Sequence, residues 1–80
     1  MGENYYLVWS NEHRAWWGSH ETGYVRRLRD AGRYSREDAL RICRNALGSA
    51  TGIGMFAELP VREDDVGEFI RGQMLLGELL

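Results

Sequence analysis

Four side chains, Glu12, His13, His20 and Cys43, belong to the types that bind metal ions or act as nucleophiles. A zinc site needs three or four converging ligands, but the spacing contains no Cys-x-x-Cys or His-x-x-x-His pair. Cysteine catalysis needs an exposed thiolate beside a base, whereas Cys43 is predicted to lie on the apolar face of a helix. We therefore expect a protein that is not an enzyme, with no catalytic residue, metal or cofactor.

Three tryptophans, Trp9, Trp16 and Trp17, bracket a polar loop that runs from Asn11 to Arg14. The aromatic and β-branched segments on either side predict a β-hairpin with this loop at its tip. Neighbouring residues of a strand point to opposite faces, so one of the adjacent indoles should enter the core and the other should lie at the surface. An exposed indole can anchor an interface, and we take Glu12, Arg14 and Trp17 as candidate partner-binding residues.

Acidic residues supply the second group of candidate partner-binding residues, which are Glu58, Glu63, Asp64, Asp65 and Glu68. Carboxylates in the first turn of a helix complement its dipole, and this is their ordinary role. A functional role would be docking on a basic groove that normally holds nucleic acid, where complementary charge speeds encounter.

The charges are unevenly distributed along the chain. Residues 23–47 carry seven arginines against three acids, whereas residues 48–80 carry six acids against two arginines. The basic segment, with Tyr24 and Tyr34 nearby, has residue types that contact phosphates and stack on bases. Because the net charge is −2, however, we expect these arginines mainly to pair with the acidic end, and direct nucleic-acid binding is the less favoured interpretation.

Two helices are predicted in the middle of the chain. Val25, Leu28 and Ala31 fall on one face of a helix over 24–31, with Thr22 as its N-cap and Gly32 at its end. Ser35 is the predicted N-cap of a second helix, which has two acids in its first turn and ends near Gly48.

The remaining elements complete a small α+β domain over residues 1–80. A strand over Met55–Leu59, ending before Pro60, is expected to pair with the first strand, and the glycine-rich stretch Gly48–Gly54 is interpreted as a linker. Residues 62–80 fit an amphipathic helix that interior glycines weaken. The predicted fold is a small three-stranded antiparallel sheet packed against two or three helices.

Chain length and composition narrow the class of protein. Eighty residues suit one domain of modest stability, which we expect to be a monomer or a weak homodimer. The single cysteine favours a reducing compartment. No apolar run approaches the ~20 residues of a membrane span, and residues 1–10 lack the features of a signal peptide. We therefore expect a cytoplasmic protein that does not bind membranes.

Two segments carry a resemblance to known proteins. Residues 5–17 (YYLVWSNEHRAWW) and residues 31–40 (AGRYSREDAL) resemble short reading frames of phages and prophages that share the pattern VWSNEHRAWW … GY … AGRYSREEA. Together with the length, the arginine-only basic residues and the acidic C-terminal part, the chain resembles the small anti-CRISPR proteins that act on type I-C Cascade.

This resemblance implies a phage-derived inhibitor in the cytoplasm of the bacterial host. Such a protein would bind the subunits of a CRISPR-Cas effector complex, Cascade, and block target DNA binding by direct contact. Anti-CRISPR proteins share no common motif, so the resemblance assigns no site residues. The alternative is a small arginine-rich nucleic-acid-binding accessory protein of a phage.

Overall fold

The first two strands form the hairpin that the tryptophan-rich segment predicts. In the computed structural model, which describes residues 5–49 and 58–79, strand β1 spans Tyr6–Ser10 and strand β2 spans Ala15–Trp17. The strands pair antiparallel, with Trp9 opposite Trp16. Aromatic and β-branched side chains favour this conformation because they pack well on a pleated surface. Residues 11–14 form the turn between the strands.

The next segment contradicts the predicted helix over 24–31. Strand β3 (Tyr24–Val25) pairs antiparallel with β2, and a single 3-10 turn, η2, follows at Leu28–Asp30. Thr22 is therefore not a helix N-cap, and its hydroxyl instead donates to the carbonyl of Ser19 at 2.5 Å. Pairing with the aromatic strand β2 overrides the weak local preference for a helix.

Val25, Leu28 and Ala31 nevertheless share one environment. All three belong to the same hydrophobic cluster, in which Ala31 is buried and the other two are partly buried. Their spacing therefore correctly indicates burial, although the backbone that produces it is not helical. Gly32 does not end a helix, and its N–H donates to the carbonyl of Trp17 at 2.9 Å.

Helix α1 (Arg36–Ser49) begins where the sequence predicts. The Ser35 hydroxyl accepts a hydrogen bond from the N–H of Asp38 at 3.1 Å, as expected of an N-cap. The helix ends within a residue of the predicted end at Gly48. Residues 50–54 of the predicted linker lie outside the described residues.

Strand β4 (Glu58–Arg62) pairs antiparallel with β1, as expected, and places Val61 opposite Leu7. The predicted end of this strand before Pro60 is wrong, because the strand continues through the proline. Pro60 has no N–H to donate, and it is tolerated because β4 is an edge strand of the described sheet. Residues 55–57, the predicted start, lie outside the described residues.

The last helix, α2 (Val66–Leu79), confirms the final amphipathic segment. It starts four residues after the predicted first residue because the 3-10 turn η3 (Glu63–Asp65) intervenes. The described residues contain two α-helices, α1 and α2, which agrees with the lower figure of the predicted two or three helices.

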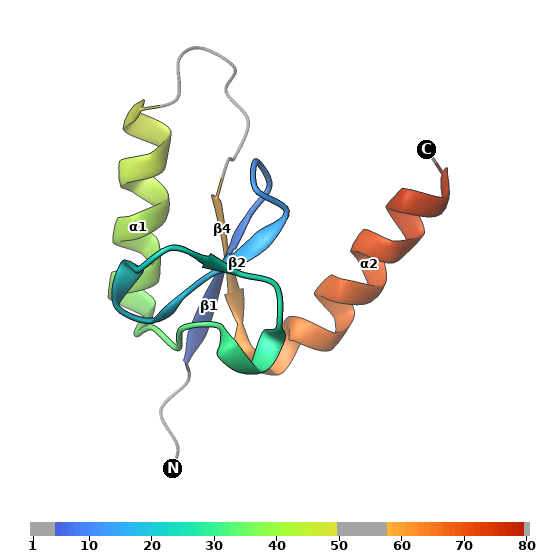
Figure 1. Cartoon of the computed structure of the whole chain (residues 1–80), viewed down its shortest axis with the longest axis horizontal. Helices are drawn as coiled ribbons and strands as arrows, with labels where there is room; N and C mark the ends of the chain where they lie inside the picture. The colour runs from blue at the N-terminus through green and yellow to red at the C-terminus, as the bar shows by residue number, and fades with distance from the viewer. Residues whose placement is uncertain (1–4, 50–57, 80) are drawn as a thin grey trace.

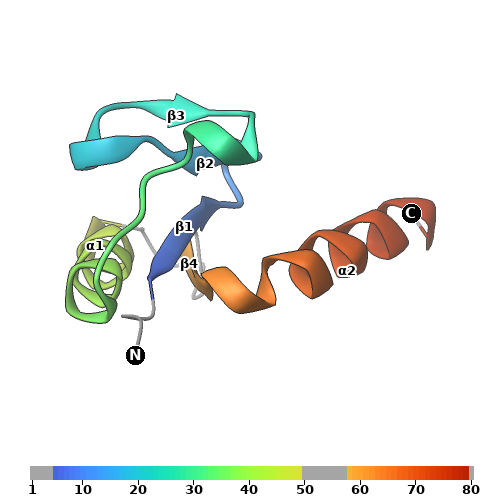
Figure 2. The same ribbon diagram turned by 90° about the horizontal axis from the view of Figure 1, so that it is seen from below.

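The four strands form one antiparallel sheet in the order β3-β2-β1-β4. The α+β class is confirmed, but the sheet has one strand more than predicted because β3 replaces part of a predicted helix. Helices α1 and α2 lie on opposite sides of the sheet (Figure 1), and α2 leads away from it toward the C-terminus (Figure 2).

Each face of the sheet has its own hydrophobic cluster, and β1 contributes to both. On the α2 side, Leu7 is fully buried with Trp16 and Val66. On the α1 side, Val8 is fully buried with Ile42 and other residues of α1. The alternation of side chains along a strand places Leu7 and Val8 on opposite faces. This two-sided core holds the hairpin strands β1 and β2 at the centre of the sheet.

Candidate functional site

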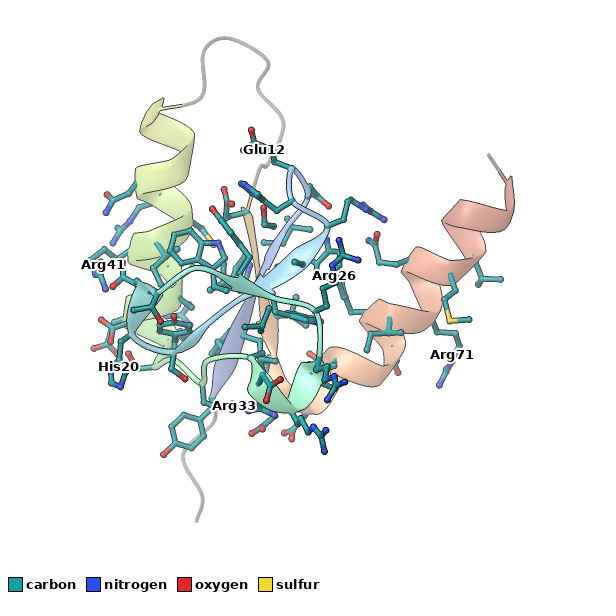
Figure 3. The ribbon with its side chains drawn as sticks, in the orientation of Figure 1. Glu12, His20, Arg26, Arg33, Arg41 and Arg71 are labelled. Carbon is teal, nitrogen blue, oxygen red and sulfur yellow. The ribbon has the colours of Figure 1, made fainter. Side chains whose placement is uncertain are left out.

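The hairpin tip has a defined shape. The Ser10 hydroxyl accepts a hydrogen bond from the N–H of His13 at 3.1 Å and lies 3.2 Å from its Nδ1. The indole N–H of Trp9 donates to the Oδ1 of Asn11 at 3.1 Å. Arg14 adopts a left-handed conformation with φ of 54°. These contacts agree with the expectation of an ordered polar loop, and they leave Glu12 exposed at its end (Figure 3).

Arg14 joins this tip to helix α2. Its guanidinium lies 5.6 Å from the ring centre of Trp9, and its Nη2 donates to the Oε1 of Gln73 at 3.1 Å. Trp9 in turn makes edge-on contacts with Trp16 and Phe69, at ring-centre distances of 5.0 and 5.7 Å. Arg14 is thus exposed but already engaged within the chain.

Trp17 and Glu58, two of the predicted partner-binding residues, contact each other inside the fold. Trp17 is half-buried and packs against the hydrophobic cluster on the α1 side, and its indole N–H donates to the Oε2 of Glu58 at 3.4 Å. Glu58 is only 5% exposed. Trp16 and Trp17 lie on opposite faces of the sheet, as expected. Trp16 is buried in the α2-side cluster, whereas Trp17, which was expected at the surface, is half-buried against the α1-side cluster.

The other acidic candidates differ in whether they form ion pairs within the chain. Glu63 forms an ion pair with Arg33 at 2.9 Å, and Asp64 lies 3.5 Å from a guanidinium nitrogen of Arg62. Asp65 and Glu68 are exposed and form no ion pair with any residue that the structure describes. Two exposed carboxylates that form no ion pair with described residues, Asp65 and Glu68, therefore lie beside Asp64 around the start of α2.

Helix α2 also exposes apolar side chains. Ile70 is 36% exposed, Leu75 56% and Met74 66%. The sequence predicts a broad apolar side for this helix, but it does not reveal that Ile70, Met74 and Leu75 are exposed while Val66 and Phe69 pack on the sheet. A combined acidic and apolar surface results, made by Asp64, Asp65, Glu68, Ile70, Met74 and Leu75. We call it the α2 surface.

The arginines of the central segment pair with the acidic end at one place only within the described residues. That contact is Arg33 with Glu63, and Arg33 also donates to the carbonyls of Leu28 and Ala31. Arg41 pairs instead with Glu21, at 2.9 Å, and with Asp38, at 3.6 Å. The expected mutual neutralisation of the two halves is therefore limited to a single ion pair among the described residues.

A polar cavity of about 600 Å³ lies beside the 3-10 turn η1 (Ser19–Glu21), which the sequence did not indicate. His20 and Glu21 both have φ of 56°, the left-handed region that favours glycine. The Tyr34 hydroxyl holds this turn, because it accepts from the N–H of Glu21 at 3.0 Å and donates to the carbonyl of Gly18. A tyrosine hydroxyl is protonated at neutral pH, and burial raises the pKa of Tyr34 further, so its hydroxyl donates this hydrogen bond.

The residue types that could have made a chemical centre do not do so within the described residues. Cys43 is buried, and desolvation, followed by the charge of Glu58, raises the pKa of its thiol to about 11. At neutral pH it is therefore not a thiolate nucleophile. No group of three or more His, Cys, Asp or Glu residues could hold a metal ion in the described parts of the chain.

Neither of the helices in the described residues has the length and apolar character needed to span a membrane.

The described fold is suited to binding through its surface, because it combines a hydrogen-bonded hairpin tip, the α2 surface and a set of exposed arginines. No protein-family model matches this chain, and searches among curated proteins and among solved structures found no significant match.

Proposed function

We propose that this chain is a phage-derived binding protein that inhibits the type I-C Cascade complex by direct contact and prevents it from binding target DNA. The target follows from the sequence resemblance. The observation that carries the proposed mode of action is the α2 surface, where exposed carboxylates of the turn η3 and of the first turn of α2 are followed by exposed apolar side chains of the same helix.

The negative charge of the α2 surface suits a basic groove of the kind that holds DNA or RNA in a nucleic-acid-binding protein. A protein that holds DNA or RNA lines its groove with arginine and lysine, and carboxylates can form charge-assisted hydrogen bonds with the same groups. Asp64, Asp65 and Glu68 would meet these basic residues. Ile70 and Met74 would add apolar area at the centre of the contact.

Burial and contacts within the chain guide our choice of interface residues. Glu58 is buried, and Trp17 and Glu63 contribute to contacts within the chain, so we leave these three out of the proposed interface. Arg14 is left out on the same ground, because it donates to Gln73 of α2, and Glu12 remains as the candidate for a second contact at the hairpin tip.

The test is a gel-shift assay of target DNA with purified type I-C Cascade, in which the inhibitor is titrated. We expect the wild-type chain to abolish the Cascade shift and Asp64→Arg/Asp65→Arg to need about tenfold or more protein, because charge reversal at an interface replaces attraction with repulsion. Asp30→Arg/Glu37→Arg is the matched control, since it makes the same charge change at two exposed positions elsewhere.

The outcomes separate the function from the interface. If the wild-type chain leaves the Cascade shift intact, the proposed function is wrong. If it inhibits and the Asp64→Arg/Asp65→Arg protein inhibits equally well, the assigned surface is wrong. Glu12→Arg, tested in the same assay, reports separately on the hairpin tip.

A further inference from the structure

Three arginines that follow strand β3 make no ion pair with any described residue. Arg26, Arg27 and Arg29 are all exposed, and the salt bridges of the described chain involve Arg33, Arg41 and Arg62 instead. Figure 3 labels Arg26, which comes directly after the strand. No described carboxylate therefore pairs with these three arginines, contrary to what the net charge of the chain suggests.

An aromatic stack precedes these arginines in β3. The ring of Tyr24 stacks on the imidazole of His13 with centres 3.8 Å apart and planes 15° apart, and Trp17 contacts Tyr24 edge-on at 5.6 Å. Tyr24 is 42% exposed, and His13 is exposed as well. The stack therefore presents aromatic surface to solvent two residues before the first of the arginines.

The position of β3 makes this region accessible. It is an edge strand of the described sheet and pairs only with β2 there. Exposed aromatic rings beside arginines are the combination that binds single-stranded nucleic acid, because unpaired bases stack on the rings while guanidinium groups contact the phosphates. A duplex keeps its bases stacked on one another and cannot use the rings in this way.

We infer that the edge formed by His13, Tyr24, Arg26, Arg27 and Arg29 binds single-stranded nucleic acid. Arg26, Arg27 and Arg29 contact successive phosphates, and the stack of Tyr24 on His13 receives a base. This activity is separate from the α2 surface and does not depend on inhibition of Cascade.

Glu12 modulates this site. It lies close enough to Tyr24 for its charge to contribute to the raised pKa of the phenol, after desolvation and Glu58. A carboxylate whose charge acts on the Tyr24 phenol also repels a phosphate near the stack of Tyr24 on His13. Removal of its charge should therefore strengthen binding.

The test is fluorescence anisotropy of a labelled oligothymidylate of about 12 nucleotides at low salt, a length within the usual range of single-strand sites. We expect saturable binding, with a logarithmic salt slope of about −2 for three phosphate contacts. Arg26→Glu/Arg27→Glu should weaken binding about tenfold or more, because two attractions become repulsions.

Arg36→Glu/Arg44→Glu is the matched control, since both side chains are exposed, form no ion pair with described residues and lie on α1. When the two double variants are compared at about 0.15 M salt, it should bind within about threefold of wild type, because charges more than about 8 Å from the bound strand are then largely screened. Tyr24→Ala should lose affinity with its salt slope unchanged, Tyr24→Phe should retain affinity, and Glu12→Gln should gain it. Far-UV circular dichroism confirms that each variant is folded.

Three results would overturn the inference. They are the absence of binding at low salt, equal loss of affinity in the two double variants, and tighter binding of a duplex than of the single strand. Because the assay contains no Cascade, failure here leaves the proposed function untouched, and failure of inhibition leaves this site untouched.

Discussion

The thiol of Cys43 lies in the cluster between α1 and the sheet, where it is 7% exposed. Burial disfavours the thiolate, and the nearby carboxylate of Glu58 adds repulsion, so the pKa rises from its usual 9.0 to about 11. The neutral thiol acts as a small apolar side chain. Its contribution to stability therefore depends on pH.

The stabilisation from the neutral thiol should disappear in alkali. The unfolded thiol ionises near pH 9 and the folded one near pH 11, so this contribution is complete below pH 9 and is lost as the pH rises toward 11. The loss is about 2–3 kcal/mol, since one unit of pKa corresponds to about 1.4 kcal/mol. Urea unfolding of wild type and Cys43→Ala between about pH 8 and about pH 11 measures this loss of stability.

The difference in unfolding free energy between the two proteins should shrink over that range. Tyr24 and Tyr34 also have raised pKa values and titrate in the same direction, but both proteins contain them, so their effect cancels. A difference that stays constant with pH would contradict the buried position of the thiol.

At the scale of elements, helix α2 is held by its first turns. Val66 and Phe69 pack on the sheet, and Gln73 receives Arg14, whereas Met74 and Leu75 are exposed. The exposed middle of this helix depends on its intrinsic propensity, which interior glycines lower. Gly72 therefore limits the stability of this helix.

Gly72→Ala should stabilise the chain, and Gly32→Ala should destabilise it. A methyl group at Gly72 meets nothing within 4 Å, and alanine gains about 0.5–1 kcal/mol over glycine inside a helix. A methyl group at Gly32 would lie 2.8 Å from the carbonyl oxygen of Gly18 and from a ring carbon of Tyr34. Thermal unfolding by circular dichroism distinguishes the two signs, and a lowered midpoint for Gly72→Ala would count against the described α2.

The elements also show which features a sequence can reveal. The start of α1 was predictable because the Ser35 cap is a local signal. The region of β3 was not, since its conformation depends on pairing with Trp16 and Trp17, and the continuation of β4 through Pro60 depends on its place at the sheet edge. Local patterns identify caps and buried positions, whereas strand neighbours are set by tertiary structure.

The candidate surfaces were predictable to a similar extent. Asp64, Asp65 and Glu68 stand out as charged residues, and they are exposed as expected. The burial of Glu58 was hidden, because only the fold brings Trp17 to its carboxylate. The sequence equally did not show that Arg26 and Arg27 form no ion pair with described residues, because counts of charges do not tell which side chains lie within ion-pair distance.

At the scale of the whole molecule, two small clusters share one sheet. Leu7 and Val8 are neighbours in β1, and each is fully buried in a different cluster. A chain of 80 residues buries little surface, so neither cluster is large enough to hold its half alone. The two faces should therefore unfold together.

Leu7→Ala should lower the free energy of unfolding by about 2–5 kcal/mol, the usual cost of a cavity at a buried leucine. Although Leu7 faces α2, the change should shift tryptophan fluorescence and the helical circular dichroism signal to the same lower urea midpoint, because both report one cooperative transition. Val8→Ala, on the other face, is the companion variant and should do the same. Separate midpoints for the two signals would show that the faces unfold independently.

The two edges of the sheet limit how copies of this chain can associate. One edge, β3, has two residues, and the other, β4, contains Pro60, which cannot donate a backbone hydrogen bond. Short or proline-containing edges are poor templates for strand addition, the route by which sheets polymerise into fibrils. The described sheet therefore resists edge-to-edge growth, so the chain should stay in solution at concentrations at which a long, regular sheet edge would begin to form fibrils.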